Sequence, residues 1–340
     1  MNLRINLKTV LFPLFVFVTI ILGLLFSLNF ESQSQYVSVF GIPIGLFFMI
    51  YPAMVKVKME EIVSSLKDIK SISTMLILNY AISPFVVTGL GYLFIIFIFH
   101  GIGIISAGIS VQVLVGIILL GVAPCIAMVI VWTDLSHGNL PLAVSFVAWN
   151  SIIQVITTPL LVYFIVRTNV TIDPLLILKS VLLYLLTPLV AGFITRKAFQ
   201  SRAFFNALLR VLNSVQTVAL LFTIFVIFWS EGRGIMEYPN LIWMIGIVML
   251  TFYFALFHIG YFLSRKLKFD YGISTSIGYS VAARDFEISI AIAISAFYAY
   301  PFVIITTAIG PLLEIPLMLL LVWIQLNREK KLIIVMKNGE

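Results

Sequence analysis

The chain has 340 residues, of which 61% are hydrophobic and only 10% are charged, and its mean hydropathy is +1.14. Soluble domains average about 45–50% apolar and about 25% charged residues, so this composition excludes a soluble globular protein. Apolar runs of roughly 20 residues, each long enough to cross a bilayer, recur along the whole length. The composition therefore predicts an all-α polytopic membrane protein.

Cysteine, histidine and charge exclude several other classes of protein. Cys125 is the only cysteine, so the chain has no internal disulfide and no zinc site built from several thiolates. The three histidines are far apart and lack the spacing of a metalloenzyme. The net charge of +7 comes mainly from basic residues in short loops, where such residues orient membrane proteins. We therefore expect no cofactor and no nucleic-acid partner.

Ten membrane-spanning helices are predicted in chain order. The first follows Arg4 and Lys8, is longer than the apolar segment of a signal peptide and precedes no A-x-A cleavage site, so we interpret it as a retained helix. The third is longer than a bilayer requires, which indicates a tilt or an interfacial part. The predicted ranges are about 10–28, 38–55, 73–99, 110–132, 141–166, 175–194, 211–229, 240–263, 272–297 and 301–326.

The basic residues predict the orientation. With the N-terminus inside, 17 of the 21 Lys and Arg residues fall on the inner side, whereas Arg167, Lys179 and Arg233 fall on the outer side. The remaining one, Arg284, lies within the ninth span. Because cytoplasmic loops are enriched in Lys and Arg, we expect both termini in the cytoplasm and the protein in the cell membrane.

The ten spans divide into two halves of five, residues 1–170 and 171–340. An odd number of spans per half inverts the second half in the membrane, which is a common plan for transporters. The halves start near Val10 and Leu175, an offset of 165 residues. The sequence thus predicts a 5+5 inverted repeat within a single transporter unit.

Polar interruptions occur at matching places in the two halves. Pro124 and Cys125 interrupt the fourth span, and the segment from Arg284 to Glu287 interrupts the ninth. The repeat offset maps Cys125 onto position 290, three residues from Glu287. Two interrupted helices at corresponding positions indicate a binding site near the membrane midplane. We therefore expect broken spans 4 and 9 to form the site.

Cys125 has two interpretations. A lone cysteine in a transmembrane helix is usually a small packing residue. However, Pro124 removes a backbone donor and loosens the turn before it, so the nearby backbone groups need other partners, such as water or a ligand. A thiol in that position is a soft ligand, which selects thiophilic species.

The stretch "SVAARDFEISIAIAI", residues 280–294, places three ionisable residues within four positions of an apolar span. Such residues usually face a cavity and mark the path of an ion or substrate. The alternative is a structural ion pair of Arg284 with Asp285 or Glu287. Desolvation favours a protonated carboxyl group and a nearby arginine favours a charged one, so the two influences on Glu287 oppose each other.

Two further spans contain polar residues of interest. Glu314 lies between two prolines of the tenth span, where it either takes part in binding a proton or cation or hydrogen-bonds to the broken ninth helix. Asn150 and Gln154 share one face of the fifth span because they are four residues apart. Polar faces in membranes often join helices, and for Asn150 we favour that role over substrate contact by a small margin while keeping it among the predicted binding residues.

Four stretches in order along the chain resemble one known family. They are "CIAMVIVWTDLSHG" and "VAWNSIIQ" in the first half, and "FEISIAIAI" and "IGPLLEIPLMLLLV" in the second. This combination resembles the arsenical-resistance arsenite efflux permeases of the bile acid/sodium symporter superfamily over almost the whole chain. The resemblance implies a panel domain from spans 1, 2, 6 and 7 and a core domain from spans 3–5 and 8–10, with broken spans 4 and 9 crossing at the substrate site.

The resemblance also implies roles for individual residues. The essential cysteine of the family falls on Cys125 and its essential glutamate on Glu287. Many members carry two asparagines where this chain has Arg284 and Asp285, and an arginine is common where Pro124 stands.

The function implied is export of trivalent arsenite, and of antimonite by the same chemistry, in exchange for protons. Cys125 is the expected metalloid contact, with Asn150 and Arg284 as further substrate-binding residues. The residues expected to couple transport to protons are Glu287, Asp285 and Glu314.

Two alternatives differ in function. A sodium-coupled importer of an organic anion would use Arg284 to pair with the anion, and Glu287 with Glu314 to bind sodium, but it leaves Cys125 without a role. An intramembrane enzyme is not predicted, because the chain has no GxSG motif and only one aspartate, Asp285, lies well within a span. The sequence predicts no oligomeric state.

Overall fold

Residues 7–56, 68–126, 128–167 and 173–338 are described by the computed structural model of the chain, and within these ranges every regular element is a helix. Arg4, Lys58 and Lys67, three of the basic residues counted for orientation, lie outside the described residues. In chain order the elements are α1 (Leu7–Asn29), α2 (Glu31–Lys56), α4 (Ile69–Ile77), η2 (Leu78–Ile82), α5 (Ser83–Gly91), η3 (Tyr92–His100), α6 (Ala107–Val122), α7 (Met128–Leu135), α8 (Leu140–Val166), α9 (Pro174–Val181), η4 (Leu182–Leu186), α10 (Thr187–Phe199), α11 (Phe205–Glu237), α12 (Pro239–Lys266), α13 (Tyr271–Ala282), α14 (Phe286–Ala296) and α15 (Pro301–Asn338). The predicted all-α class is confirmed.

The helices have the length and surface of membrane spans. Large apolar side chains such as Phe85 and Phe97 are exposed on the outside of the bundle, where contact with lipid is favourable and contact with water is not. Six segments of the described chain are long and apolar enough to cross a membrane: Ile69–His100, Leu140–Val166, Pro174–Phe199, Phe205–Glu237, Pro239–Lys266 and Pro301–Lys331. Shorter apolar helices accompany them, namely Leu14–Asn29, Phe40–Lys56, Ala107–Val122 and Phe286–Ala296. The chain is a polytopic helical membrane protein.

Two of the predicted spans are broken in the middle. The break between α6 and α7 surrounds Pro124, and the break between α13 and α14 surrounds Arg284; we call these the first break and the second break. Ala123 is extended, with φ −101° and ψ 108°, as sterics favour for a residue that precedes proline. Pro124 and Arg284 pair as an antiparallel β-bridge. The two broken helices predicted from the sequence therefore meet in the fold.

The third predicted span is one continuous helix from Ile69 to His100 that contains two π-helical segments, η2 and η3. The segment η2 ends directly before Ser83 and Pro84. A proline inside a helix removes one amide donor and its ring crowds the carbonyl four residues earlier, here that of Tyr80. A local widening of the helix relieves this crowding, and it places Tyr80 on η2.

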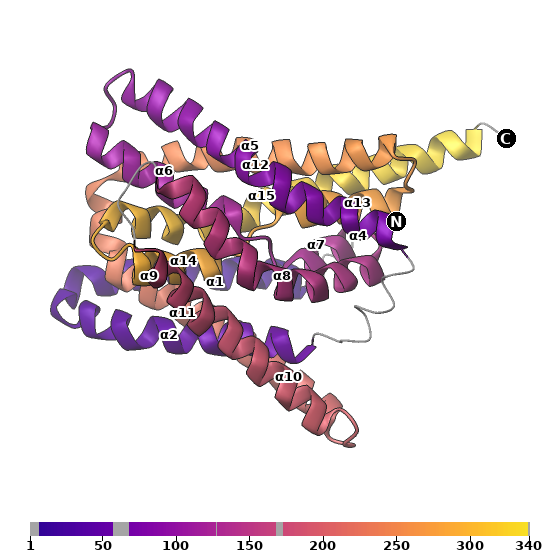
Figure 1. Cartoon of the computed structure of the whole chain (residues 1–340), viewed down its shortest axis with the longest axis horizontal. Helices are drawn as coiled ribbons and strands as arrows, with labels where there is room; N and C mark the ends of the chain where they lie inside the picture. Colours follow the sequence, from indigo (N-terminus) through magenta and orange to yellow (C-terminus); the bar gives the residue numbers. More distant parts are fainter. Residues whose placement is uncertain (1–6, 57–67, 127, 168–172, 339–340) are drawn as a thin grey trace.

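The helices pack as two groups, and Figure 1 shows most of them side by side along the long axis of the molecule. The panel group consists of α1, α2, α10 and α11, which pack on one another. The core group consists of α4–α8 and α12–α15, with the two broken helices among them. The groups meet where α11 contacts α15 and α2 contacts α14, and α9 contacts α8 and α14. The panel group contains predicted spans 1, 2 and 7 and the second part of predicted span 6, whereas α9, the first part of predicted span 6, contacts the core group.

Gly23 allows close packing within the panel group. A methyl group on Gly23 of α1 would lie 2.7 Å from Phe228 Cβ and 2.9 Å from the carbonyl oxygen of Phe225, both on α11. Gly89 on α5 is a useful contrast, because a methyl group there would meet no atom within 4 Å. The panel group therefore depends on a missing side chain at Gly23.

We expect Gly23→Ala to lower the free energy of unfolding by about 1–3 kcal/mol, since overpacking forces α1 away from α11. Gly89→Ala, the matched control, is expected to be neutral or slightly stabilising because alanine is the better helix former. Thermal unfolding of the purified proteins in detergent measures both. Equal transition temperatures for the two variants would contradict the packing described.

Candidate substrate and ion site at the crossing of two broken helices

The backbone of the two breaks is joined by hydrogen bonds. The amide of Cys125 in the first break donates to the carbonyl of Ala283 in the second at 3.2 Å. The amide of Asp285 in the second break donates to the carbonyl of Ala123 in the first at 2.8 Å. Backbone groups within an apolar bundle need protein partners, and here each break supplies them to the other. This exchange brings Cys125 and Asp285, 160 residues apart in the chain, into one site.

Cys125 lies at the start of the half-helix α7. Its thiol is free, only 2% of the residue is exposed, and its sulfur accepts a hydrogen bond from the Met128 amide at 3.2 Å. The thiol therefore occupies the position of a helix-capping side chain.

Asn150 joins α8 to the first break. Its side chain is completely buried, and its Nδ2 donates to the Pro124 carbonyl at 3.0 Å. Its Oδ1 accepts a hydrogen bond of 2.5 Å from the Tyr80 hydroxyl. Gln154, one turn further along, accepts from Asn150 at 3.4 Å, and its own Nε2 is buried without a hydrogen bond. The helix-joining contact that we favoured for Asn150 is thus present, and it is made to the broken span.

Arg284 is held by backbone carbonyls. Its side chain is completely buried, Nη1 donates to Gly121 O at 3.2 Å, and Nη2 donates to Val281 O. These carbonyls belong to the last turns of α6 and α13, where the negative ends of two helix dipoles favour a cation. The guanidinium also lies over the Phe252 ring, 5.5 Å from its centroid, while Nε has no partner.

The predicted alternative of a structural ion pair at Arg284 does not occur in this conformation. Within the described part of the chain, Arg284 forms no ion pair with either acid that follows it. The reason is geometric: the guanidinium points back to the C-terminal ends of α6 and α13, whereas Asp285 and Glu287 begin the next half-helix. Sequence proximity alone suggested a pair that the helix break separates.

Three carboxyl groups lie on the other side of the crossing. Asp285 caps α14 by accepting from the Ile288 amide at 3.2 Å, and its carboxyl group interacts with that of Glu287 in the first turn. Glu287 is 8% exposed and Glu314 is 1% exposed. Like charges repel strongly in a buried site. These carboxyl groups are therefore suited to taking up a proton, although among the described residues no three acidic side chains are arranged to hold a metal ion.

Glu314 projects from α15 toward the second break. Its Oε2 accepts a hydrogen bond of 2.8 Å from the Tyr253 hydroxyl, and it interacts with the Arg284 backbone amide. Its Oε1 is buried without a partner. Of the two predicted roles, the contact with the broken helix is therefore observed, and one oxygen is left for a ligand.

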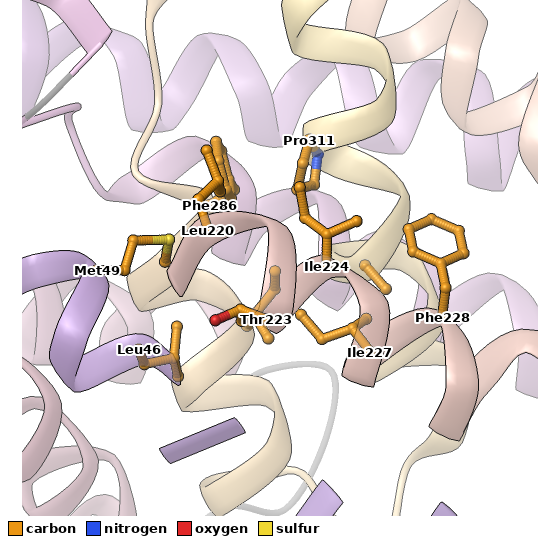
Figure 2. A pocket seen from close by; sticks show the side chains of 11 residues that line it. Leu46, Met49, Leu220, Thr223, Ile224, Ile227, Phe228, Phe286 and Pro311 are labelled. Carbon is orange, nitrogen blue, oxygen red and sulfur yellow. The ribbon is translucent and has the colours of Figure 1, made fainter. Parts of the chain in front are cut away.

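A small pocket of about 10 Å³, near the minimum that holds one water molecule, lies between the panel group and the core group (Figure 2). Two core residues line it: Phe286, which lies between Asp285 and Glu287 in the sequence, and Pro311, which lies one turn before Glu314. Thr223 of α11 is the one polar residue in its lining. The packing between the two groups is thus incomplete beside the acidic side of the crossing.

Sequence reasoning missed Tyr80 and Tyr253. Each is an isolated tyrosine in an apolar span, and its hydroxyl is the only signal that it needs a polar partner. The partner in each case lies on a distant span, so spacing within a helix does not reveal it. All six predicted site residues (Cys125, Asn150, Arg284, Asp285, Glu287 and Glu314) are brought together at the crossing.

Residues 43–238 match the sodium bile acid symporter family. This match covers more than half of the chain. The chain belongs to this family. The family is one of transporters, so the protein is a membrane transporter.

Individual relatives agree with the resemblance noted in the sequence. The arsenical-resistance protein Acr3 of Alkaliphilus metalliredigens (strain QYMF) is 31% identical over 306 residues, which is 88% of this chain and 85% of that protein. The protein of the same name from Corynebacterium glutamicum is 27% identical over 344 residues, 95% of this chain and 90% of the relative. An uncharacterized transporter of Synechocystis is 32% identical over 304 residues, 86% of this chain and 79% of the relative. The resemblance to arsenical-resistance permeases is confirmed.

We expect Asn150→Leu to lower the free energy of unfolding by about 1–3 kcal/mol, because it leaves the buried Pro124 carbonyl and Tyr80 hydroxyl without partners. Ser151→Ala is the matched control, since Ser151 is equally buried but bonds only to a carbonyl of its own helix. Thermal unfolding in detergent compares the two. A loss no larger than that of Ser151→Ala would refute the role of Asn150 at the break.

Proposed function

We propose that the protein exports trivalent arsenite from the cytoplasm in exchange for protons. The single observation that carries this proposal is the placement of the only cysteine at the crossing of two broken helices, beside a cluster of buried carboxyl groups. A soft ligand and ionisable groups in one site are what a thiophilic substrate and a coupled ion require. The names of the relatives from Alkaliphilus and Corynebacterium support arsenic as the metalloid.

The chemistry of the substrate fits a site with one thiol. Trivalent arsenic is present at neutral pH as its uncharged hydroxide, which resembles a small polyol in shape. Cys125 contacts the arsenic atom, and Asn150 and Arg284, which flank the thiol, bind its hydroxyl groups through donors such as the free Nε of Arg284. Antimonite has the same valence and the same affinity for thiols, so we propose it as a second substrate.

This chain has Pro124 at a position where an arginine is common in the family, yet a guanidinium, that of Arg284, is present at the crossing. Arg284 is the direct partner of Pro124 in the β-bridge. The second broken helix therefore supplies a positive charge, that of Arg284, beside Pro124. This supports a positive charge at the site that comes from the second broken helix.

Coupling to an ion is required because a neutral solute gains nothing from the membrane potential. One proton moving inward contributes about 2.3 kcal/mol per 100 mV. We propose Glu287 as the proton carrier, with Asp285 and Glu314 adjusting its charge from nearby. Release of its proton inside favours loading of arsenite, and reprotonation outside favours discharge.

The layout that we propose around this site is ten spans in two inverted halves, residues 1–170 and 171–340, with α6–α7 as span 4 and α13–α14 as span 9. The excess of basic residues on one side supports cytoplasmic termini in the cell membrane. Movement of the core group against the panel group supplies alternating access. The incomplete packing between the groups beside Phe286 and Pro311 supports movement at that interface.

The deciding experiment is arsenite uptake into everted membrane vesicles. We expect wild-type vesicles to accumulate arsenite when a proton gradient is imposed and to lose it when the gradient is collapsed. Cys125→Ala is expected to abolish accumulation, because the soft ligand is lost, while the protein remains in the membrane at wild-type amounts. Full accumulation by Cys125→Ala would remove the thiol from the mechanism.

Glu287→Gln is expected to abolish gradient-driven accumulation, because an amide cannot carry the proton. The control is Glu329→Gln, the same substitution at a carboxylate that pairs with His137 away from the crossing, with a contact of 2.8 Å. Vesicle uptake at a fixed proton gradient measures both. Accumulation by Glu287→Gln equal to that of Glu329→Gln would contradict the assignment.

The alternative is sodium-coupled import of an organic anion, which the family description favours. Arg284 would then pair with the anion, and Glu287 and Glu314 would bind sodium. The donors of Arg284 argue against this, since both of its Nη atoms already bind carbonyls. Sodium-dependent uptake of a labelled anion by right-side-out vesicles that do not move arsenite would establish the alternative.

A further inference from the structure

The first break is held from two neighbouring spans. Tyr80, on the span before the broken helix, donates its hydroxyl hydrogen to Asn150 at 2.5 Å. Asn150, on the span after it, donates to the Pro124 carbonyl at 3.0 Å. Tyr80 thus fixes the orientation of the Asn150 side-chain amide, which in turn donates to the Pro124 carbonyl left without a partner by the break.

The second break is held in the same way. Tyr253, on the span before the broken helix, donates to Glu314 Oε2 at 2.8 Å. Glu314, on the span after it, interacts with the backbone amide of Arg284 in the break. Both of these side chains are buried, with Tyr253 and Glu314 each 1% exposed.

The two arrangements correspond element by element. In each half of the chain the order is a span with the tyrosine, the broken span, and a span with the polar side chain that holds the break. The polar partners differ in kind, because an amide side chain donates to a carbonyl of the break in the first half, whereas a carboxyl group lies against a backbone amide of the break in the second. Two backbone hydrogen bonds then join the breaks to each other.

We propose that Tyr80 and Tyr253 are a matched pair of positioning residues, which hold the two breaks through Asn150 and Glu314 and so set the position of the Cys125 thiol. Neither tyrosine touches Cys125 by a hydrogen bond. Each tyrosine acts through the side chain that it orients. We call Tyr80 with Asn150 the first brace and Tyr253 with Glu314 the second brace. Because the breaks are joined, the loss of either brace affects the position of the thiol.

The difference between the braces assigns them different tasks, and this step rests on the proposed function. Asn150 carries an amide and cannot change its charge. Glu314 has one buried oxygen without a partner and can exchange a proton or bind a cation. The first brace therefore serves the thiophilic substrate, and the second brace also serves the coupled ion.

The test of the tyrosine pair uses the only cysteine as a reporter of the crossing. Membranes containing each variant are treated with N-ethylmaleimide, and the rate of Cys125 modification is measured without substrate. We expect Tyr80→Phe and Tyr253→Phe each to raise this rate about tenfold, since a lost buried hydrogen bond favours opening by about that factor. Tyr279→Phe is the control, because Tyr279 is completely buried and bonds to Ser136 at 2.6 Å but touches neither brace.

The control is expected to stay within about twofold of the wild-type rate, because the hydroxyl that it removes bonds to Ser136 and not to Asn150 or Glu314. Asn150→Leu removes the partner of Tyr80 and so tests the first brace independently. We expect it to raise the rate of Cys125 modification by the same factor as Tyr80→Phe. Modification of Tyr80→Phe, Tyr253→Phe and Asn150→Leu at the rate of Tyr279→Phe would overturn the proposal. Because no arsenite is present, this result stands apart from the success or failure of the proposed function.

The division of tasks is tested with Glu314→Gln, which gives the second brace an amide like the first. We expect its maleimide rate to remain within about twofold of wild type, since the amide oxygen still accepts from Tyr253. We also expect arsenite to protect Cys125 as it does in wild type, while accumulation driven by a proton gradient is lost. Gradient-driven accumulation at the wild-type level would show that Glu314 is a brace only, and loss of protection would place it with the substrate instead.

Discussion

The structure depends on the need to pair the backbone groups of two helices that are broken inside an apolar bundle. Away from water, an unpaired amide or carbonyl is costly, and each break leaves several such groups. The protein meets this requirement by crossing the breaks, so that Cys125 donates to Ala283 and Asp285 donates to Ala123. The groups that remain are met by side chains from the neighbouring spans, Asn150 on one side and Glu314 on the other.

The crossing also places the positively charged group and the acidic group at opposite kinds of helix end. The C-terminal ends of α6 and α13 face one guanidinium, that of Arg284, through the carbonyls of Gly121 and Val281. The N-terminal ends of α7 and α14 carry the thiol of Cys125 and the carboxyl group of Asp285. The C-terminal ends thus hold the cation that their dipoles favour, and the N-terminal end of α14 holds a carboxyl group. Donor groups, acceptor groups and a thiol therefore lie close together at the crossing.

The hydrogen bonds between the breaks also join the two broken helices into one unit within the core group. Since the two breaks share hydrogen bonds, neither can change its angle without straining the other, and both belong to the core group. The panel group touches the crossing chiefly through α2 and α11, where packing is incomplete beside Phe286. The crossing is therefore held together within the core group, and a small pocket lies where the panel group meets it.

The sequence by itself determined the apolar spans, the membrane class and the two interruptions, because hydropathy and proline act through local chemistry that each segment carries alone. It also located Cys125 and Glu287 at those interruptions and Glu314 between two prolines of the tenth span. Only the tertiary structure decided the partners: Arg284 binds the ends of two half-helices instead of the adjoining acids, Asn150 holds the first break, and Tyr80 and Tyr253 orient the side chains that hold both breaks. These contacts join separate spans: the two residues are 26 apart in the chain for Asn150 with Pro124, 70 apart for Tyr80 with Asn150 and 61 apart for Tyr253 with Glu314. No periodicity within one helix encodes them, since they arise from the angle at which separate helices pack.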